Sequence, residues 1–143
     1  DSGIKLQITN KLNDKELIRL ISYEELILIP ISIFKNNSPL EALVKYLKDN
    51  LGFKLNGIAS LLNRDERNMW HSYDNAIKKI TKLDTTSKIL IPINILTNRR
   101  LSILENLTYY LNSKEVSLNN ISKLLNRNYK TIYTVYKRAK DKY

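Results

Sequence analysis

Cysteine is absent from this chain of 143 residues, and histidine occurs once, as His71. The lack of cysteine excludes disulfides and thiolate-bound metal, and a single histidine does not make a zinc site. Three glycines are too few for a glycine-rich loop that cradles a nucleotide phosphate. No apolar run approaches the roughly 20 residues of a membrane-spanning helix, so no membrane segment is predicted.

Catalytic groupings are missing from the sequence as well. It has no Ser/His pair and no cluster of carboxylates for a divalent metal. Its nine tyrosines lack the set of Arg and His partners that a tyrosine recombinase requires. We therefore predict no catalytic residue, no metal and no cofactor, and the chain is not expected to be an enzyme.

An internal repeat is the main feature that the sequence does contain. Residues 58–64 (IASLLNR) recur 63 positions later as residues 121–127 (ISKLLNR). A fixed period of this kind indicates a fold built from two copies of one unit. The match extends upstream to two further pairs of segments, 27–31 with 89–93 and 40–47 with 104–111.

The spacing of apolar residues predicts a mainly α-helical fold of two tandem three-helix helix-turn-helix units, each with a short extended lead-in segment. Ser38 and Asp65 are expected to cap two of the helices. The lead-in segments, 27–34 and 89–96, are apolar and β-branched, and they can pair with each other across the repeats. The predicted helices cover 39–50, 56–62 and 65–80 in the first unit, and 102–113, 119–125 and 128–142 in the second.

The domain organisation follows from the same pattern. The predicted parts are an extension at 1–26, the first repeat at 27–80, a linker at 81–88 and the second repeat at 89–143. Within the extension, we expect a strand over 4–9 and a helix over 14–22. The linker is polar and unpatterned, and its short length keeps the two repeats adjacent.

Four positions in each unit are typical of a helix-turn-helix. The second helix needs a small residue where the third helix crosses it, and the turn needs a residue that tolerates left-handed backbone angles. The third helix then needs a cap and an apolar residue that enters the core. These positions hold Ala59, Asn63, Asp65 and Met69 in the first unit, and Ser122, Asn126, Asn128 and Ile132 in the second.

The second copy resembles the promoter-recognition helix-turn-helix of sigma factors, through residues 117–125 (SLNNISKLL), 131–133 (TIY) and 137–140 (KRAK). The chain is also similar to uncharacterised archaeal helix-turn-helix proteins that have an Ile-Pro-x-x-Ile lead-in. The resemblance covers about 38–79 and 102–142, and it implies major-groove docking by the third helix. The duplication, and the lack of a region that binds core polymerase, argue against a sigma factor itself.

The net positive charge of the chain comes entirely from residues 75–143. The net charge is +10, yet residues 1–74 carry ten basic and ten acidic side chains, whereas residues 75–143 carry fourteen basic and four acidic. An excess on one side of a protein favours binding to a polyanion. The basic stretch is not one long amphipathic helix, which favours nucleic acid over an anionic membrane.

A helical wheel divides the third helix of the second unit into two faces. Ile132, Val135, Tyr136 and Ala139 form the face expected in the core. In such motifs the first turns contact bases and the later residues contact the backbone. We therefore assign Lys130, Thr131, Tyr133 and Thr134 to base contacts, and Arg127, Lys137, Arg138 and Lys140 to phosphate contacts.

The equivalent face of the first unit carries fewer positive charges. Asp74 stands where the second unit has Lys137, and a carboxylate close to phosphate is repulsive. We expect the second unit to dominate affinity. The candidate DNA contacts in the first unit are Arg64, Arg67, Asn68, Trp70 and His71.

These features predict a protein that binds double-stranded DNA, with transcription regulation as its leading role and a cytoplasmic, nucleoid-associated location. Two recognition helices in one chain would mimic the two-fold dimer of simpler repressors, and a homodimer is left open. Three alternatives remain at this point. They are an architectural DNA-binding protein with little sequence preference, a protein-interaction module whose first repeat has lost DNA binding, and the DNA-binding fragment of a transposase.

Overall fold

The computed structural model describes residues 27–143, and the strand and helix predicted at 4–9 and 14–22 lie outside the described residues. The described part is mainly helical, with one two-stranded sheet. Its first half (residues 27–80) contains β1 (Leu28–Pro30), η2 (Ile31–Phe34), α3 (Pro39–Lys45), η3 (Tyr46–Asn50), α4 (Leu55–Leu62) and α5 (Glu66–Lys79). Its second half (residues 89–143) contains β2 (Leu90–Pro92), η4 (Ile93–Leu96), α6 (Ile103–Ser113), α7 (Leu118–Leu125) and α8 (Tyr129–Lys142).

The two lead-in segments are extended over only part of their predicted length. Each strand ends at a proline, and the residues that follow form a 3₁₀ helix, so the extended conformation predicted for 31–34 and 93–96 is wrong. Proline has no N–H to continue a ladder, and the φ of −64° at both Pro30 and Pro92 suits the entry to a helical turn. The pairing of the two lead-ins is confirmed, because β1 and β2 form an antiparallel pair.

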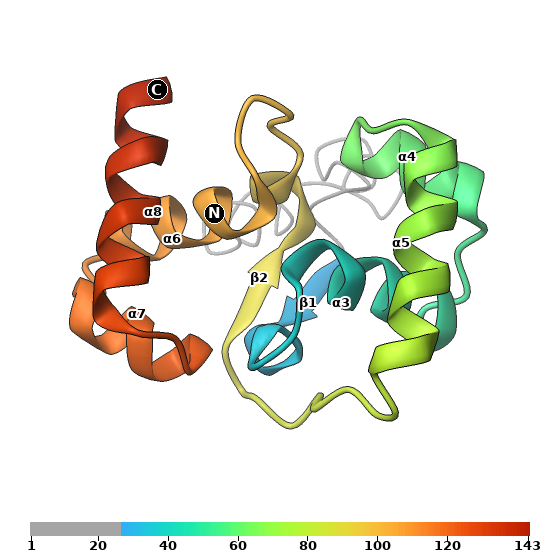
Figure 1. Ribbon diagram of the computed structural model, residues 1–143, viewed down its shortest axis with the longest axis horizontal. Coiled ribbons are helices and arrows are strands. Elements are labelled where there is room, and N and C mark those ends of the chain that lie inside the picture. The colour runs from blue at the N-terminus through green and yellow to red at the C-terminus, as the bar shows by residue number, and fades with distance from the viewer. Residues whose placement is uncertain (1–26) are drawn as a thin grey trace, which may run out of the picture.

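The strand pair relates the two halves by a local two-fold axis. Ile29 and Ile91 occupy equivalent places in the repeat, and they lie opposite each other in the ladder. The hydrogen bonds from Ile31 N to Ile89 O and from Ile93 N to Ile27 O are both 3.0 Å long, and each becomes the other when the halves are exchanged. In Figure 1, α5 and α8 lie toward opposite ends of the molecule and run in opposite directions, with the strand pair between them.

The helix boundaries agree with the sequence pattern except in the helix predicted over 39–50, where α3 ends at Lys45 and η3 forms a π-helical turn. The caps of the helices differ. At the start of α6, Ser102 accepts a hydrogen bond from Glu105 N while the Glu105 carboxylate accepts one from Ser102 N. Ser38 and Asp65 stand at the cap positions of α3 and α5, but neither side chain makes the expected cap hydrogen bond. Both residues are exposed, so water can satisfy the helix N–H groups in their place.

Buried side chains of both halves form one continuous core. The strands and 3₁₀ turns supply its centre, where Ile29, Phe34, Ile91 and Leu96 are almost completely buried. The segment predicted as a linker belongs to this structure, because Leu83 is buried and the Ser32 hydroxyl donates to Asp84 O at 2.6 Å. The two halves are therefore held together by a shared core, and the segment that connects them packs against this core.

Candidate nucleic-acid interface

Helix α8 presents a polar and basic face to solvent. Its apolar face packs on α6 and α7, with Ile132 and Ala139 buried and Val135 and Tyr136 half-buried, as the helical wheel predicts. The residues assigned to DNA on this helix are all exposed: Lys130, Thr131, Tyr133, Thr134, Lys137, Arg138 and Lys140. The helix therefore offers all of these side chains on its outward side.

The turns before α5 and α8 have the geometry that the sequence predicts. Asn63 has φ 55° and ψ 48°, and Asn126 has φ 50° and ψ 52°, which is the left-handed conformation at both places. Asn tolerates these angles better than other non-glycine residues. The positions predicted to be small or apolar are buried, and they are Ala59, Met69, Ser122 and Ile132. The side chain of Asn128 accepts from Lys130 N at 2.8 Å, so this predicted cap is confirmed.

The charges on α8 are largely free to meet a ligand. Its basic residues are Lys130, Lys137, Arg138, Lys140 and Lys142, against one carboxylate, Asp141. Lys142 donates to the Glu105 carboxylate at 2.8 Å. The other four basic side chains form no ion pair with any residue from 27 to 143. These four side chains are exposed and make no direct ion pair in the described part of the protein, although Arg138 lies close enough to Glu105 to lower the pKa of that carboxyl.

Exposed aromatic rings lie beside these charges. Tyr129, which the sequence reasoning missed, is 48% exposed and stacks near Tyr133 with ring centroids 6.4 Å apart. The signal was present in the sequence, because residues four apart lie on the same face of a helix. In α5, Trp70 occupies the place equivalent to Tyr133 and is 55% exposed, with His71 edge-on at 5.3 Å. Each of the two helices thus displays an aromatic side chain at the same position.

Helix α5 has a different charge pattern on its exposed face. Arg67, Asn68, Trp70 and His71 are exposed, as expected. The lysines at its C-terminal end are engaged within the protein, Lys78 with Asp74 at 2.9 Å and Lys79 with Glu41 at 3.4 Å. This leaves α5 with a surface that is closer to neutral than that of α8.

Arg127 does not occupy the phosphate-contact position that the sequence suggested. Its guanidinium donates to Phe34 O at 2.8 Å, to Leu125 O at 3.0 Å and to Asn37 O. Burial removes water from this group and lowers its pKa. The left-handed turn at Asn126 directs the Arg127 side chain toward the first half instead of outward, so Arg127 holds the two halves together.

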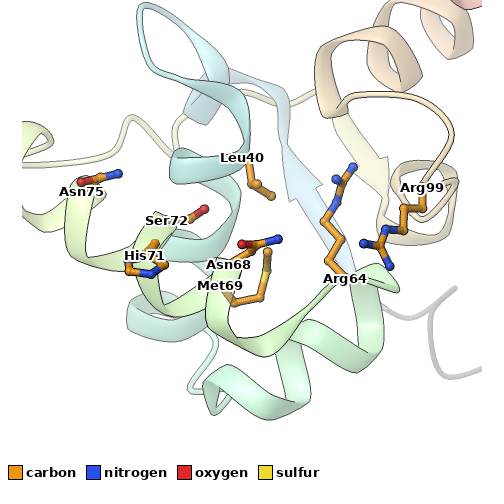
Figure 2. A pocket seen from close by; sticks show the side chains of 8 residues that line it. All are labelled: Leu40, Arg64, Asn68, Met69, His71, Ser72, Asn75 and Arg99. Carbon is orange, nitrogen blue, oxygen red and sulfur yellow. The ribbon is translucent and has the colours of Figure 1, made fainter.

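Arg64 is the equivalent residue in the first half, and it too reaches across to the other half. Its guanidinium donates to Leu101 O at 3.2 Å, just before Ser102, as Asn37 comes just before Ser38. Its Nε atom is buried and has no hydrogen-bond partner among residues 27–143. Burial and then the positive charge of Arg99 lower the pKa of Arg64. It lines a recessed cavity (Figure 2) rather than the outer surface of α5, so its predicted phosphate contact would have to be made inside this cavity.

Comparison with known protein families, curated proteins and solved structures gives no match. Among residues 27–143, no helix is both long and apolar enough to cross a membrane.

Proposed function

We propose that this protein binds double-stranded DNA with two helix-turn-helix units and regulates transcription. The observation that carries the proposal is the unpaired basic face of α8, presented after a left-handed Asn turn of the kind that the motif uses. The motif would be formed by α4 and α5 in the first half and by α7 and α8 in the second, which follow each other in the same order. In this proposal, α5 and α8 are the recognition helices.

The local two-fold axis supports binding across two half-sites. B-form DNA has two-fold axes perpendicular to its length, so a two-fold protein can place equivalent helices in successive major-groove segments. The halves of this chain are related through Ile29 and Ile91, and α5 and α8 flank the strand pair (Figure 1). We expect a target with two half-sites about 34 Å apart, which is one turn of DNA.

The side chains on the two helices suggest separate tasks. Lys137, Arg138 and Lys140 suit phosphate oxygens, whereas Lys130 and Thr131 lie in the first turn of α8, where such motifs contact base edges. In α5, Arg67 is the exposed cation at the place equivalent to Lys130. We expect α8 to supply most of the affinity and α5 to select the second half-site.

A protein-docking role for the first half is the second candidate. It is favoured by Trp70, a large aromatic side chain that is 55% exposed on a helix whose lysines are paired within the protein. Exposed aromatics are frequent anchors of protein interfaces. In this version, α8 alone binds DNA, and the target has a single half-site.

Selection from random duplex DNA, followed by a salt titration of the selected duplex and a scrambled duplex, tests the proposal. We expect two enriched half-sites and an affinity gap of at least about 10³-fold between the duplexes. One enriched half-site would favour the docking role of α5. Tight binding without any motif would identify an architectural protein, and no binding at moderate salt would contradict DNA binding altogether.

A further inference from the structure

A cavity of 240 Å³ lies between α5 and the loop that precedes α6. Figure 2 shows Arg64 and Arg99 at one end of it, His71, Ser72 and Asn75 along α5 at the other, and Asn68 between them. Leu40 and Met69 complete the lining among the described residues. The cavity therefore combines two positive charges with several neutral polar groups, and none of these lining residues is acidic.

Two features of the Arg64 environment are unfavourable for its charged side chain. Its Nε atom is buried without a hydrogen-bond partner in the described part of the chain, and a buried donor that is left unpaired is destabilising. The charge of Arg99 adds a repulsion that lowers the pKa of Arg64 further than burial alone. An anion between the two arginines would offset this repulsion, although it would not reach the Nε atom, which has almost no accessible surface.

The second half shows that the fold does not require two arginines to lie close together at this place. Arg127 stands at the place equivalent to Arg64, and its guanidinium donates to three carbonyl oxygens. Residues 97–101 before α6 are two longer than residues 35–37 before α3, and this longer loop carries Arg99. The extra loop residues thus bring a second arginine to one half, in a place where the shorter loop has Lys-Asn-Asn.

We propose that Arg64 and Arg99 bind a phosphate group in this cavity. A guanidinium presents paired N–H donors that match the oxygens of phosphate, and such charge-assisted hydrogen bonds are among the strongest in proteins. Asn68 and Ser72 line the same cavity and can donate further neutral hydrogen bonds. The phosphate is either free inorganic phosphate or a phosphate of the DNA backbone. The site does not depend on DNA binding by α8.

Titration with inorganic phosphate against chloride, at constant ionic strength, tests the site in the full chain. Phosphate should raise the midpoint of thermal unfolding and shift the Nε–H resonance of Arg64, which Arg64→Lys assigns. Arg99→Gln should weaken phosphate binding roughly tenfold or more, because it removes one of the two charged partners. The matched control is Arg100→Gln. Arg100 is exposed and next to Arg99 but does not line the cavity, so binding should change less than about twofold.

A second titration with the selected duplex identifies the source of the phosphate. If Arg99→Gln also weakens duplex binding and reduces the salt slope by about one, the cavity holds a backbone phosphate. If duplex binding is unchanged while phosphate binding is lost, the ligand is free phosphate. A protein that binds phosphate but no duplex would keep this site and contradict the proposed function. The site itself is wrong if phosphate acts no differently from chloride, or if Arg99→Gln and Arg100→Gln have equal effects.

Discussion

Helices α5 and α8 occupy equivalent places in the two halves, yet their surfaces differ. Four basic side chains of α8 have no ion-pair partner among the described residues, whereas the lysines of α5 are paired with Asp74 and Glu41. The arginines that follow the two turns differ as well, because Arg127 is held by three carbonyl oxygens and Arg64 by one. One backbone framework thus carries two different surfaces.

The buried positions show the opposite behaviour. At several equivalent buried places the two halves carry identical residues or residues of similar size, whereas Phe34 with Leu96 and Ala42 with Asn106 differ. The matching pairs are Ile29 with Ile91, Ile58 with Ile121, Leu62 with Leu125, Met69 with Ile132, and Ala76 with Ala139. Packing constrains side-chain volume inside the protein, whereas exposed positions are free to vary in charge. The comparison therefore separates residues that hold the fold from residues that give each half its own task.

The largest effect should come from a change in the shared core. Phe34 is fully buried, and Phe34→Ala should lower the free energy of unfolding by about 3–5 kcal/mol through lost contacts and a cavity. Leu28→Ala is the control, because Leu28 is 43% exposed and its loss should cost less than about 1 kcal/mol. Urea unfolding, monitored by circular dichroism, measures the free energy of unfolding of both variants.

The same experiment tests whether the halves unfold together. Trp70 is the one tryptophan of the chain, so its fluorescence reports the first half, while circular dichroism reports all helices. Because the core is continuous, the two signals should change at the same urea concentration. Two separate transitions would contradict a shared core, since each half would then unfold as an independent domain.

The second effect concerns DNA affinity. The double substitution Lys130→Ala and Arg138→Ala removes one cation assigned to base edges and one assigned to phosphate. It should weaken binding to the selected duplex roughly 100-fold and reduce the salt slope by about one. Arg67→Ala in α5 should weaken binding only a few-fold. Lys88→Ala is the control, because Lys88 is exposed but lies outside both helices. Equal losses from the two helices would show that the charge difference between them does not determine affinity.

The third prediction is that Arg127 contributes more to stability than Arg64. Arg127→Ala leaves Phe34 O and Asn37 O without their donor, so we expect a loss of about 2 kcal/mol in unfolding free energy. Arg64→Ala removes one hydrogen bond but also a repulsion from Arg99, so the loss should stay below about 1 kcal/mol. Chemical unfolding of both variants measures the difference. If the two losses are equal, the arginines have the same structural role.

Most of the local structure was accessible from the sequence. Apolar spacing and the residues Asn63, Asn126 and Pro39 defined the helices and turns. The observed helix boundaries lie within a residue or two of the predictions, except that the helix predicted over 39–50 is α3 continued by the π-helical turn η3. The 3₁₀ turns after Pro30 and Pro92 were missed, because a short apolar run is compatible with either an extended or a helical segment.

The relation between the halves was not accessible from the sequence. A direct repeat leaves the symmetry of the two copies open, and it is fixed by the register that places Ile29 opposite Ile91. The roles of Arg64 and Arg127 follow from that arrangement, since each side chain reaches a carbonyl group of the other half. Helical periodicity gives no direction for either arginine, because both lie in the turns between two helices. The role of α5 and α8 in DNA binding stays a prediction.

The smallest effect compares two equivalent ion pairs. Glu105 and Lys142 are 2.8 Å apart with the Glu105 side chain buried, whereas Glu41 and Lys79 are 3.4 Å apart. Glu105→Gln keeps the cap at the start of α6, because glutamine can accept the same hydrogen bond from Ser102 N. The substitution therefore isolates the charge, and we expect a loss of about 1 kcal/mol at neutral pH, against a few tenths of a kcal/mol for Glu41→Gln.

The pH dependence of the Glu105→Gln variant gives the sharper test. Burial would raise the pKa of Glu105, but hydrogen bonds from Lys142 and from the backbone of Ser102 outweigh it and hold the pKa below its ordinary value of 4.5. The charged carboxylate thus stabilises the folded state above pH 4.5, and this contribution is lost as the pH falls through the lower folded-state pKa. The gap in stability between the original protein and Glu105→Gln should close in acid. A gap that persisted once Glu105 is protonated would show that packing, and not the ion pair with Lys142, distinguishes the second half at this position.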